Sequence, residues 1–426
     1  MSFSAGVSQT DVTPNRPVWM AGYGDRDRRS EGIYQHLRAG ALYLRGTNDE
    51  ALLITVDLIG FDLAFAAQAK QRIALATGML PRQIVLTATH THCGPHFYPM
   101  IMNGEPEWEY AEWLCQRFID IAIGARKNAV PAQLAFTRTR SKFGINRRLT
   151  KNGATKMAPN PDGPIDRDLD TMWLSDTSGK LLSTLTVYGC HPTSLAGYLI
   201  GGDYPGFLCR ELEEKTGAPA FFGTGCAGDV RPWYNPGEKK FERPQMHAVK
   251  MAGQTMAEEI LAKQNEKETV RSECLAISDG FHLLPFAERP DFDFLNHVIT
   301  SGGGQRQRWA EHLQSVLHKG PLPASCPHEI QVLELNPQFR MVFLGGEILS
   351  EIGLHIKELF SPTTTITVGY SNGLIGYIPS KNAYPHGGYE VNGSHHYFML
   401  PAPYTDKAED YLINETQRIT NLLGHS

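Results

Sequence analysis

Apolar and polar positions along the chain form blocks that predict strands and helices in turn. Continuous apolar runs at 51–58, 83–89 and 219–224 are typical of strands buried on both faces. Helical spacing covers 64–77, and an aromatic-rich amphipathic stretch covers 107–128. The same criteria predict further helices at about 205–216, 244–266, 348–360 and 405–423, and further strands at 181–190, 329–336 and 339–345.

This order of elements predicts an α/β fold, in which a mixed parallel and antiparallel sheet is flanked by helices. No clean linker divides the chain, so we expect a single large catalytic domain over residues 1–426. Two stretches, 145–169 and 285–327, are rich in Pro, Gly and polar residues, and we predict irregular loops there. The sequence shows no internal repeat.

Composition narrows the class of protein. The chain has 426 residues, of which 41% are hydrophobic and 20% charged, so it is globular rather than disordered. The net charge is -5 and no Lys/Arg run occurs, which argues against a nucleic-acid partner. No apolar run is long enough for a transmembrane helix. With no signal-like start and seven scattered cysteines, we expect a cytoplasmic protein with reduced thiols; a trimmed secreted form is the alternative.

The sharpest chemical signal is Thr89-His90-Thr91-His92-Cys93-Gly94-Pro95-His96, which begins where an apolar strand ends. Sites in open α/β sheets form at the carboxyl ends of strands. In extended backbone, His90 and His92 would point to the same side because side chains alternate with period two. This geometry suits two metal ligands, or one ligand beside one acid/base group.

Two other strand ends carry metal-ligand residue types. His191 follows the strand at 181–190, and Glu347 follows the strand at 339–345. If the strands share a sheet, His90, His191 and Glu347 would form a ligand set of catalytic zinc. The alternatives are a core histidine at 191 and, at 347, a carboxylate favoured by a helix N-terminus.

Other residues near these motifs stay open from the sequence alone. Asp57 also ends a strand and could orient a ligand histidine, while Asp229 lies in a glycine-rich turn at 223–232. Cys93, Cys190 and Cys226 could be nucleophiles or soft ligands, but packing is the commoner role of such residues.

Several motifs, taken in order, resemble the N-terminal catalytic domain of the neutral/alkaline non-lysosomal ceramidases. The resemblance runs from about residue 5 to about 400 and rests on the opening GVSQTDVTP, then MAGYG, THTHCGP, Asn146-Arg147, HPTS, DYPG, GDVRP, Gly346-Glu347, Gly376-Tyr377, Tyr384 and Tyr389-Glu390.

The resemblance implies a mixed α/β domain with a zinc ion at one end of the sheet. It implies His90, His191, Glu347 and Tyr384 as zinc ligands, with His92 beside the zinc-bound water. It further implies that Arg147 and Tyr397 bind the carbonyl oxygen or the developing oxyanion. The predicted activity is zinc-dependent hydrolysis of an N-acyl amide bond, with a small molecule or lipid as substrate.

The chain also departs from that family, which carries a further C-terminal β-sandwich domain. Cys93, His96-Phe97 and Arg148-Leu149 replace family residues around the expected pocket mouth. The metal chemistry is therefore better supported than ceramide itself. The alternatives are a metal-dependent hydrolase of an ester, lactone, phosphoester or sugar/cyclitol-type derivative, and a non-catalytic ligand-binding relative. The sequence does not give the oligomeric state.

Overall fold

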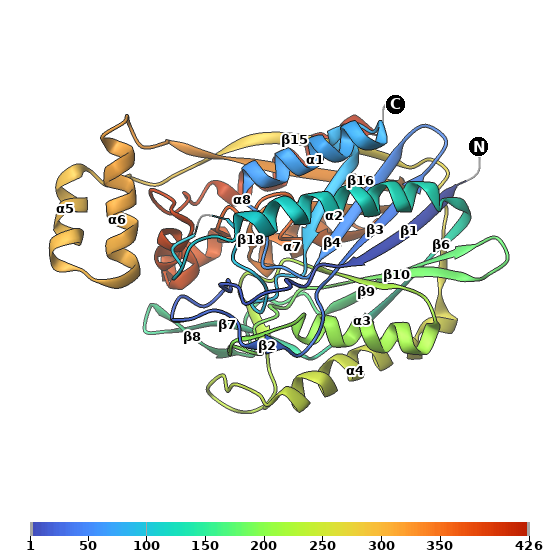
Figure 1. The fold of residues 1–426 in the computed structure, drawn as a ribbon, viewed down its shortest axis with the longest axis horizontal. Coiled ribbons are helices and arrows are strands. Elements are labelled where there is room, and N and C mark those ends of the chain that lie inside the picture. Colours follow the sequence, from blue (N-terminus) through green and yellow to red (C-terminus); the bar gives the residue numbers. More distant parts are fainter. Residues whose placement is uncertain (1–2, 99, 424–426) are drawn as a thin grey trace.

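The computed structural model describes residues 3–98 and 100–423, and it confirms the predicted class of mixed sheets with flanking helices (Figure 1). One strand pattern recurs three times: two antiparallel strands, then a helix, then a strand parallel to the second. Its first copy comprises β3 (Arg38–Arg45), β4 (Glu50–Val56), α1 (Leu63–Thr77) and β5 (Ile84–Ala88). The second comprises β9 (Asp168–Asp176), β10 (Leu181–Tyr188), α3 (Asp203–Thr216) and β12 (Ala220–Thr224). The third comprises β16 (Ser325–Asn336), β17 (Phe339–Leu344), α7 (Ser350–Leu359) and β19 (Thr364–Val368).

The first two copies belong to one nine-stranded sheet in the order β12-β10-β9-β6-β1-β3-β4-β5, and β14 also pairs with β6. They are joined at β1 (Ser4–Asp11) and β6 (Val130–Arg140), which share only two residue pairs. Around this narrow junction the two halves turn toward each other, so that Thr224 at the end of β12 donates a hydrogen bond to the carbonyl of Thr89 just beyond β5. The two ends of the sheet therefore meet.

One apolar core lies between the three sheet sections. Leu53 of β4, Leu185 of β10 and Met341 of β17 belong to the same buried cluster. Each section packs its outer face against its own pair of helices. These pairs are α1 with α2 (Trp108–Lys127), α3 with α4 (Met246–Ala262), and α7 with α8 (Ala408–Leu423).

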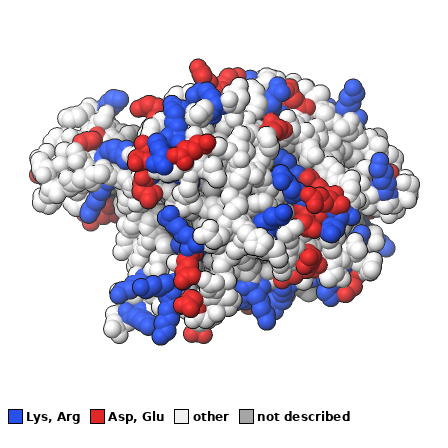
Figure 2. Space-filling model, turned by 60° about the horizontal axis from the view of Figure 1, so that its bottom comes forward, with Lys and Arg blue, Asp and Glu red and all other residues white. Residues whose placement is uncertain are grey.

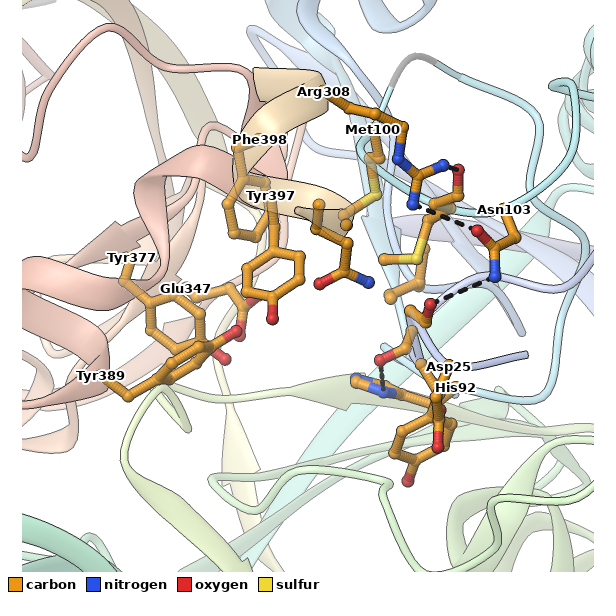
Figure 3. Close-up of a pocket in the computed structure, with 17 residues that line it drawn as sticks. Asp25, His92, Met100, Asn103, Arg308, Glu347, Tyr377, Tyr389, Tyr397 and Phe398 are labelled. Atoms are coloured by element: carbon orange, nitrogen blue, oxygen red, sulfur yellow. Dashed lines mark hydrogen bonds between the residues drawn. The ribbon is translucent and has the colours of Figure 1, made fainter. Parts of the chain in front are cut away.

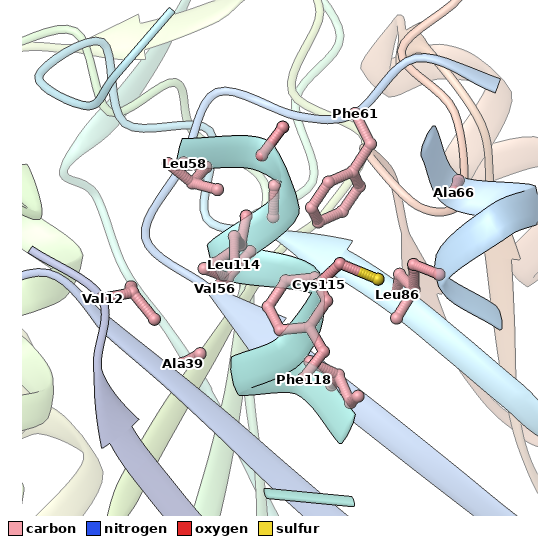
Figure 4. Packing of buried hydrophobic residues seen from close by; sticks show 14 of the residues in the cluster. Val12, Ala39, Val56, Leu58, Phe61, Ala66, Leu86, Leu114, Cys115 and Phe118 are labelled. Carbon is pink, nitrogen blue, oxygen red and sulfur yellow. The ribbon is translucent and has the colours of Figure 1, made fainter. Parts of the chain in front are cut away.

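The packing of the first section shows why its strands read as continuous apolar runs. Val56 and Leu86 face outward onto α2, where they meet Leu114 and Phe118 (Figure 4), whereas their neighbours along the strands face the shared core. A strand with apolar partners on both faces has no polar side to alternate with.

The other strands and helices are short or peripheral. They are β2 (Gly32–Ile33), β7 (Gly144–Lys151), β8 (Ala154–Asn160), β11 (Leu199–Ile200), β13 (Val230–Pro232), β14 (Glu268–Val270), β15 (Ala276–Pro285), β18 (Glu347–Ile348), β20 (Tyr377–Ile378), α5 (Phe292–Ser301) and α6 (Gly304–Leu317).

The two stretches predicted as irregular loops are ordered elements. Residues 145–169 hold the β7–β8 hairpin, whose turn has Asn152 and Gly153 at φ 52° and 77°. Asn-Gly is a strong signal for such a turn, but neither strand shows an apolar alternation, because β8 is largely exposed and the buried positions of β7 carry polar residues. Residues 285–327 hold α5 and α6, which project from the sheets (Figure 1) and share a small core that includes Leu295, Trp309 and Leu313. The apolar face of each of these helices is short, and the glycines between the helices indicated a loop.

The surface shows no large field of one sign on the face in Figure 2. Acidic and basic side chains are interspersed there around a wide uncharged area, with a small basic group at its lower left. Among the helices in the described part of the chain, none is long and apolar enough to cross a bilayer.

Candidate metal centre

The three sheet sections each deliver one candidate ligand to the same end of the molecule. His90 follows β5, His191 follows β10, and Glu347 begins β18 directly after β17. All three side chains are buried, with exposed fractions of 0%, 0% and 3%. Oε2 of Glu347 lies 2.9 Å from Nε2 of His191 and 3.4 Å from Nε2 of His90. The structure thus brings together the three residues that the sequence placed at strand ends.

The His-x-His pair also converges, but not through extended backbone. His90 has φ 64°, in the left-handed region, which a residue other than glycine adopts only where its surroundings hold it. Even so, Nε2 of His92 lies 3.3 Å from Nε2 of His90. Ring nitrogens of His90, His92 and His191 all lie within 4.8 Å of one another.

Backbone carbonyls set the tautomer of each ring. Nδ1 of His90 donates to the carbonyl of Ile59 at 2.6 Å, and Nδ1 of His92 donates to that of Gly22 at 3.1 Å. Nδ1 of His191 donates to the carbonyl of Ala227. Since a neutral imidazole carries one N–H, all three Nε2 atoms are left as acceptors.

For His92 and His191, protonation does not change this assignment at neutral pH. Burial, followed by the charge of Arg147, lowers the pKa of His191 to about 4. Burial also lowers the pKa of His92 well below its usual value. Three acceptor nitrogens and the Glu347 carboxylate therefore face one another with too few donors between them. A divalent cation fits this donor set, because neutral imidazole and carboxylate are its usual ligands and the Nδ1 contacts are those that orient ligand histidines.

A tyrosine joins the cluster, and it is Tyr377 rather than Tyr384. β18 and β20 pair in parallel with Glu347 opposite Tyr377, so this pairing places the two side by side. The Tyr377 hydroxyl lies 3.3 Å from Nε2 of His191. Tyr384 instead donates its hydroxyl to the carbonyl of Thr405 at 2.7 Å, away from the cluster. The prediction for Tyr384 is corrected accordingly: the motif Gly376-Tyr377 was visible, but the pairing that brings it to Glu347 was not.

Arg147 reaches the cluster through Tyr377. It is 4% exposed, donates from Nε to Glu390 at 2.8 Å, and donates from Nη2 to the Tyr377 hydroxyl at 3.0 Å. Arg148 holds the other oxygen of Glu390 at 2.6 Å. Glu390 therefore fixes Arg147, and Arg147 orients the hydroxyl of Tyr377 beside His191.

A cavity of about 650 Å³ opens onto this cluster. His92, Glu347 and Tyr377 line it, whereas His90 and His191 lie behind them. Tyr397, predicted near the oxyanion, also lines the cavity, together with Tyr389 and Phe398 on the Glu347 side (Figure 3). Asp25, Asn103 and Arg308 line the opposite side, where α6 forms the wall.

The remaining candidates have supporting contacts. Asp229 accepts hydrogen bonds from the backbone of Ser350 and the side chain of Asn146, and so joins α7 to β7. Asp57 accepts a hydrogen bond from the backbone of Arg38. Burial raises the pKa of Cys93 and of Cys226 to about 12, which leaves neutral thiols suited to packing.

Comparison with known proteins agrees with this arrangement. Residues 3–236 match the family model described as neutral/alkaline non-lysosomal ceramidase, N-terminal. The chain belongs to this family.

Individual members of the ceramidase family are distant in sequence. The chain is 24% identical over 306 residues to a neutral ceramidase of Pseudomonas aeruginosa, a match that covers 63% of this chain and 44% of the relative. It is 23% identical over 257 residues to neutral ceramidase A of Dictyostelium discoideum, covering 54% and 36%. The chain therefore matches less than half the length of these curated relatives.

The fold is shared over almost the whole chain. The crystal structure of the Pseudomonas aeruginosa neutral ceramidase superimposes with a TM-score of 0.74 at 19% identity, covering 99% of this chain and 74% of that one. A structure described as a ceramidase complexed with C2 gives a TM-score of 0.73 at 17% identity, covering 99% and 76%. At these identities the likeness establishes the fold.

Proposed function

We propose that this protein is a metal-dependent hydrolase that cleaves an N-acyl amide bond of the ceramide type. The observation that carries the proposal is the convergence of three imidazole acceptors and one carboxylate at the inner end of a cavity. Membership of the ceramidase family supports the amide bond as the target. Zinc as the metal, and a cytoplasmic location, remain predictions.

The residues that would hold the ion are His90, His191 and Glu347, with Tyr377 in the place first predicted for Tyr384. Each of the two histidines is fixed by a carbonyl behind it, and Glu347 contacts both. A bound divalent cation supplies a Lewis acid for the carbonyl oxygen and lowers the pKa of water.

The chain's own residues handle the protons and the charge. His92 lines the cavity and presents an unprotonated Nε2, so it can accept a proton from the attacking water. Water oxygen then bonds to the acyl carbon, the C–N bond breaks, and His92 delivers the proton to the leaving nitrogen. The Tyr377 hydroxyl, held by Arg147, is placed to donate to the oxygen on which negative charge develops.

The direct test is fatty-acid release from a short-chain ceramide by the purified protein, with metal content measured on the same sample. We expect release with about one divalent ion per chain, and loss of both in His90→Ala. His386→Ala, at an exposed histidine that does not line the cavity, is the matched control and should keep both. Release that survives exhaustive chelation would contradict the proposal.

A second candidate is hydrolysis of an ester or lactone at the same site. The donor set that favours a metal does not distinguish amide from ester carbonyls. Octanoyl esters assayed beside octanoyl amides decide between them: ester turnover without amide turnover would keep the metal centre and reject the amide.

A further inference from the structure

The wall of the cavity opposite the metal-binding residues carries polar side chains with free hydrogen-bonding groups, one of them exposed and two half-buried. Asp25, Gln305 and Arg308 line it. The side chains of Asp25 and Gln305 have no hydrogen-bond or ion-pair partner within residues 3–98 and 100–423. These two groups are therefore available to a ligand.

Arg308 adds donors at the same wall without an opposing carboxylate. It donates from Nη1 to the carbonyl of Met102 at 2.9 Å and from Nη2 to Oδ1 of Asn103 at 3.1 Å. A guanidinium has five N–H groups, so three remain. In Figure 3 the Arg308 guanidinium points toward Asn103, on the side of the cavity away from Tyr377 and Tyr397.

The Gln305 amide lies directly against the loop at Gly24. A Cβ added to Gly24 would lie 1.6 Å from Nε2 of Gln305, so the amide rests directly on the Gly24 backbone. Gly24 in turn accepts a hydrogen bond through its carbonyl from Asn103. The loop at Gly24 and helix α6 thus place a half-buried Gln305 amide at the cavity, without a hydrogen-bond partner among the described residues.

The chemistry of these groups selects a ligand type. The Asp25 carboxylate accepts hydrogen bonds, the Arg308 guanidinium donates them, and the Gln305 amide does both. The negative charge of the carboxylate and the positive charge of the guanidinium cancel. An alkyl chain against this wall would displace water from these groups without offering them hydrogen-bond partners, which is unfavourable. Hydroxyl groups donate and accept at once and satisfy all three.

We propose that this wall binds a polyhydroxylated group, such as a sugar or cyclitol ring, so that the substrate is an N-acyl amide with a polyhydroxylated amine half rather than a second long alkyl chain. The apolar side chains of Ile59 and Phe398 line other parts of the cavity and suit the acyl part, whereas Met100 lies beside Arg308 (Figure 3). The substrate assignment rests on the proposed function, whereas the binding of the polyhydroxylated group does not.

A binding experiment tests the wall without any turnover. Octyl β-glucoside and tetraethylene glycol octyl ether share an alkyl chain and differ in their heads, and titration calorimetry measures their affinity for the purified protein. We expect the glucoside to bind at least about tenfold more tightly, which corresponds to 1.4 kcal/mol. Equal affinity would overturn the proposal.

Two variants localise the effect. Gln305→Leu removes the free amide with little change in volume, and it should remove the preference for the glucoside. Gln307→Leu, on the same helix but bonded to Glu311 outside the cavity, is the matched control and should keep the preference. Gly24→Ala should act like Gln305→Leu, because it displaces the amide without changing it. A preference for the glucoside that persists in both cavity variants would also overturn the proposal. Melting temperatures establish that each variant folds.

A hydrolysis experiment separates this proposal from the proposed function. We expect N-octanoylglucosamine to be cleaved with kcat/KM at least about tenfold above that of N-octanoylsphingosine, and Gln305→Leu to raise KM for the former. A preference for the sphingosine amide, or for N-octanoylglutamate through the charge of Arg308, would overturn the inference and leave the amide hydrolase standing. Glucoside binding without cleavage of any amide would reject the hydrolase and uphold the wall.

Discussion

The two sides of the cavity differ in how their polar atoms are held. On the metal-binding side, His90 and His191 each have Nδ1 committed to a backbone carbonyl, and Arg147 is fixed by Glu390. On the α6 side, Asp25 and Gln305 have no such partners. The difference teaches that the first side is built to keep one geometry for a reaction, whereas the second can exchange its hydrogen bonds with water or substrate.

The two sides of the cavity also differ in the structural elements that supply their residues. The metal-binding side takes one residue from each of the three repeated sheet sections, so its geometry depends on the whole core. The α6 wall belongs to a hairpin with a small core of its own. Changes at the first side should therefore abolish activity, and changes at the second should alter which substrate is used.

The largest effect is expected from Glu347→Gln. The amide keeps the shape but loses the charge that would balance a divalent ion, so we expect kcat/KM to fall by at least about 1000-fold together with metal content. Glu358→Gln, at an exposed position on α7, is the control for the substitution itself. Full activity in Glu347→Gln would show that the Glu347 carboxylate is not needed to hold the metal ion.

Gly22→Ala should displace His92 without changing any residue that is proposed to hold the metal ion. Gly22 has φ 96°, and an added Cβ would lie 2.4 Å from Nδ1 of His92. We expect about a 100-fold loss of kcat with metal content retained, since a displacement of about 1 Å is enough for such a loss. Gly153→Ala is strained in the same way at φ 77° but has nothing within 4 Å, so it should leave kcat unchanged.

Tyr377→Phe and Tyr384→Phe form a pair that tests the corrected assignment. Tyr377→Phe removes the hydroxyl beside His191 and should lower kcat by at least about tenfold. Tyr384→Phe removes hydrogen bonds to Tyr404 and Thr405, so it should cost about 1 kcal/mol of unfolding free energy and leave kcat within about twofold. The reverse pattern in steady-state kinetics would restore Tyr384.

A last effect changes acid stability and leaves the reaction itself untouched. His328 donates from Nε2 to the carbonyl of Gly345, two residues before Glu347, and burial lowers its pKa to about 3. The unfolded state, with a pKa near 6.5, binds more protons between about pH 3 and 6.5, so stability is present above that window and lost as pH falls through it.

Urea unfolding at pH 7 and pH 5 measures this effect. The wild type should lose about 2 kcal/mol more than His328→Gln between the two pH values. His386→Gln provides the control at an exposed histidine. Equal losses in wild type and His328→Gln would show that His328 titrates normally in the folded protein.

Much of the fold and part of the site follow from local pattern. Strands buried on both faces appear in the sequence as continuous apolar runs, as at β4, β5 and β12. Helices with one buried face show the helical period of apolar residues, as at α1 and α2. His90, His191 and Glu347 were found because each directly follows such a strand. The α5–α6 hairpin was missed because the glycines between its helices indicated a loop, and the β7–β8 hairpin was missed because its strands are polar at buried and exposed positions alike.

The sequence by itself determined which residue types stand at the strand ends, because burial and backbone periodicity are local properties of a segment. Only the tertiary structure decided which ends meet. The closure of the sheet near Thr89 and Thr224, the pairing that sets Tyr377 beside Glu347, and the packing of Gln305 on Gly24 all join segments far apart in the chain. Such contacts depend on the packing of whole sheet sections around one core, and no local pattern encodes them.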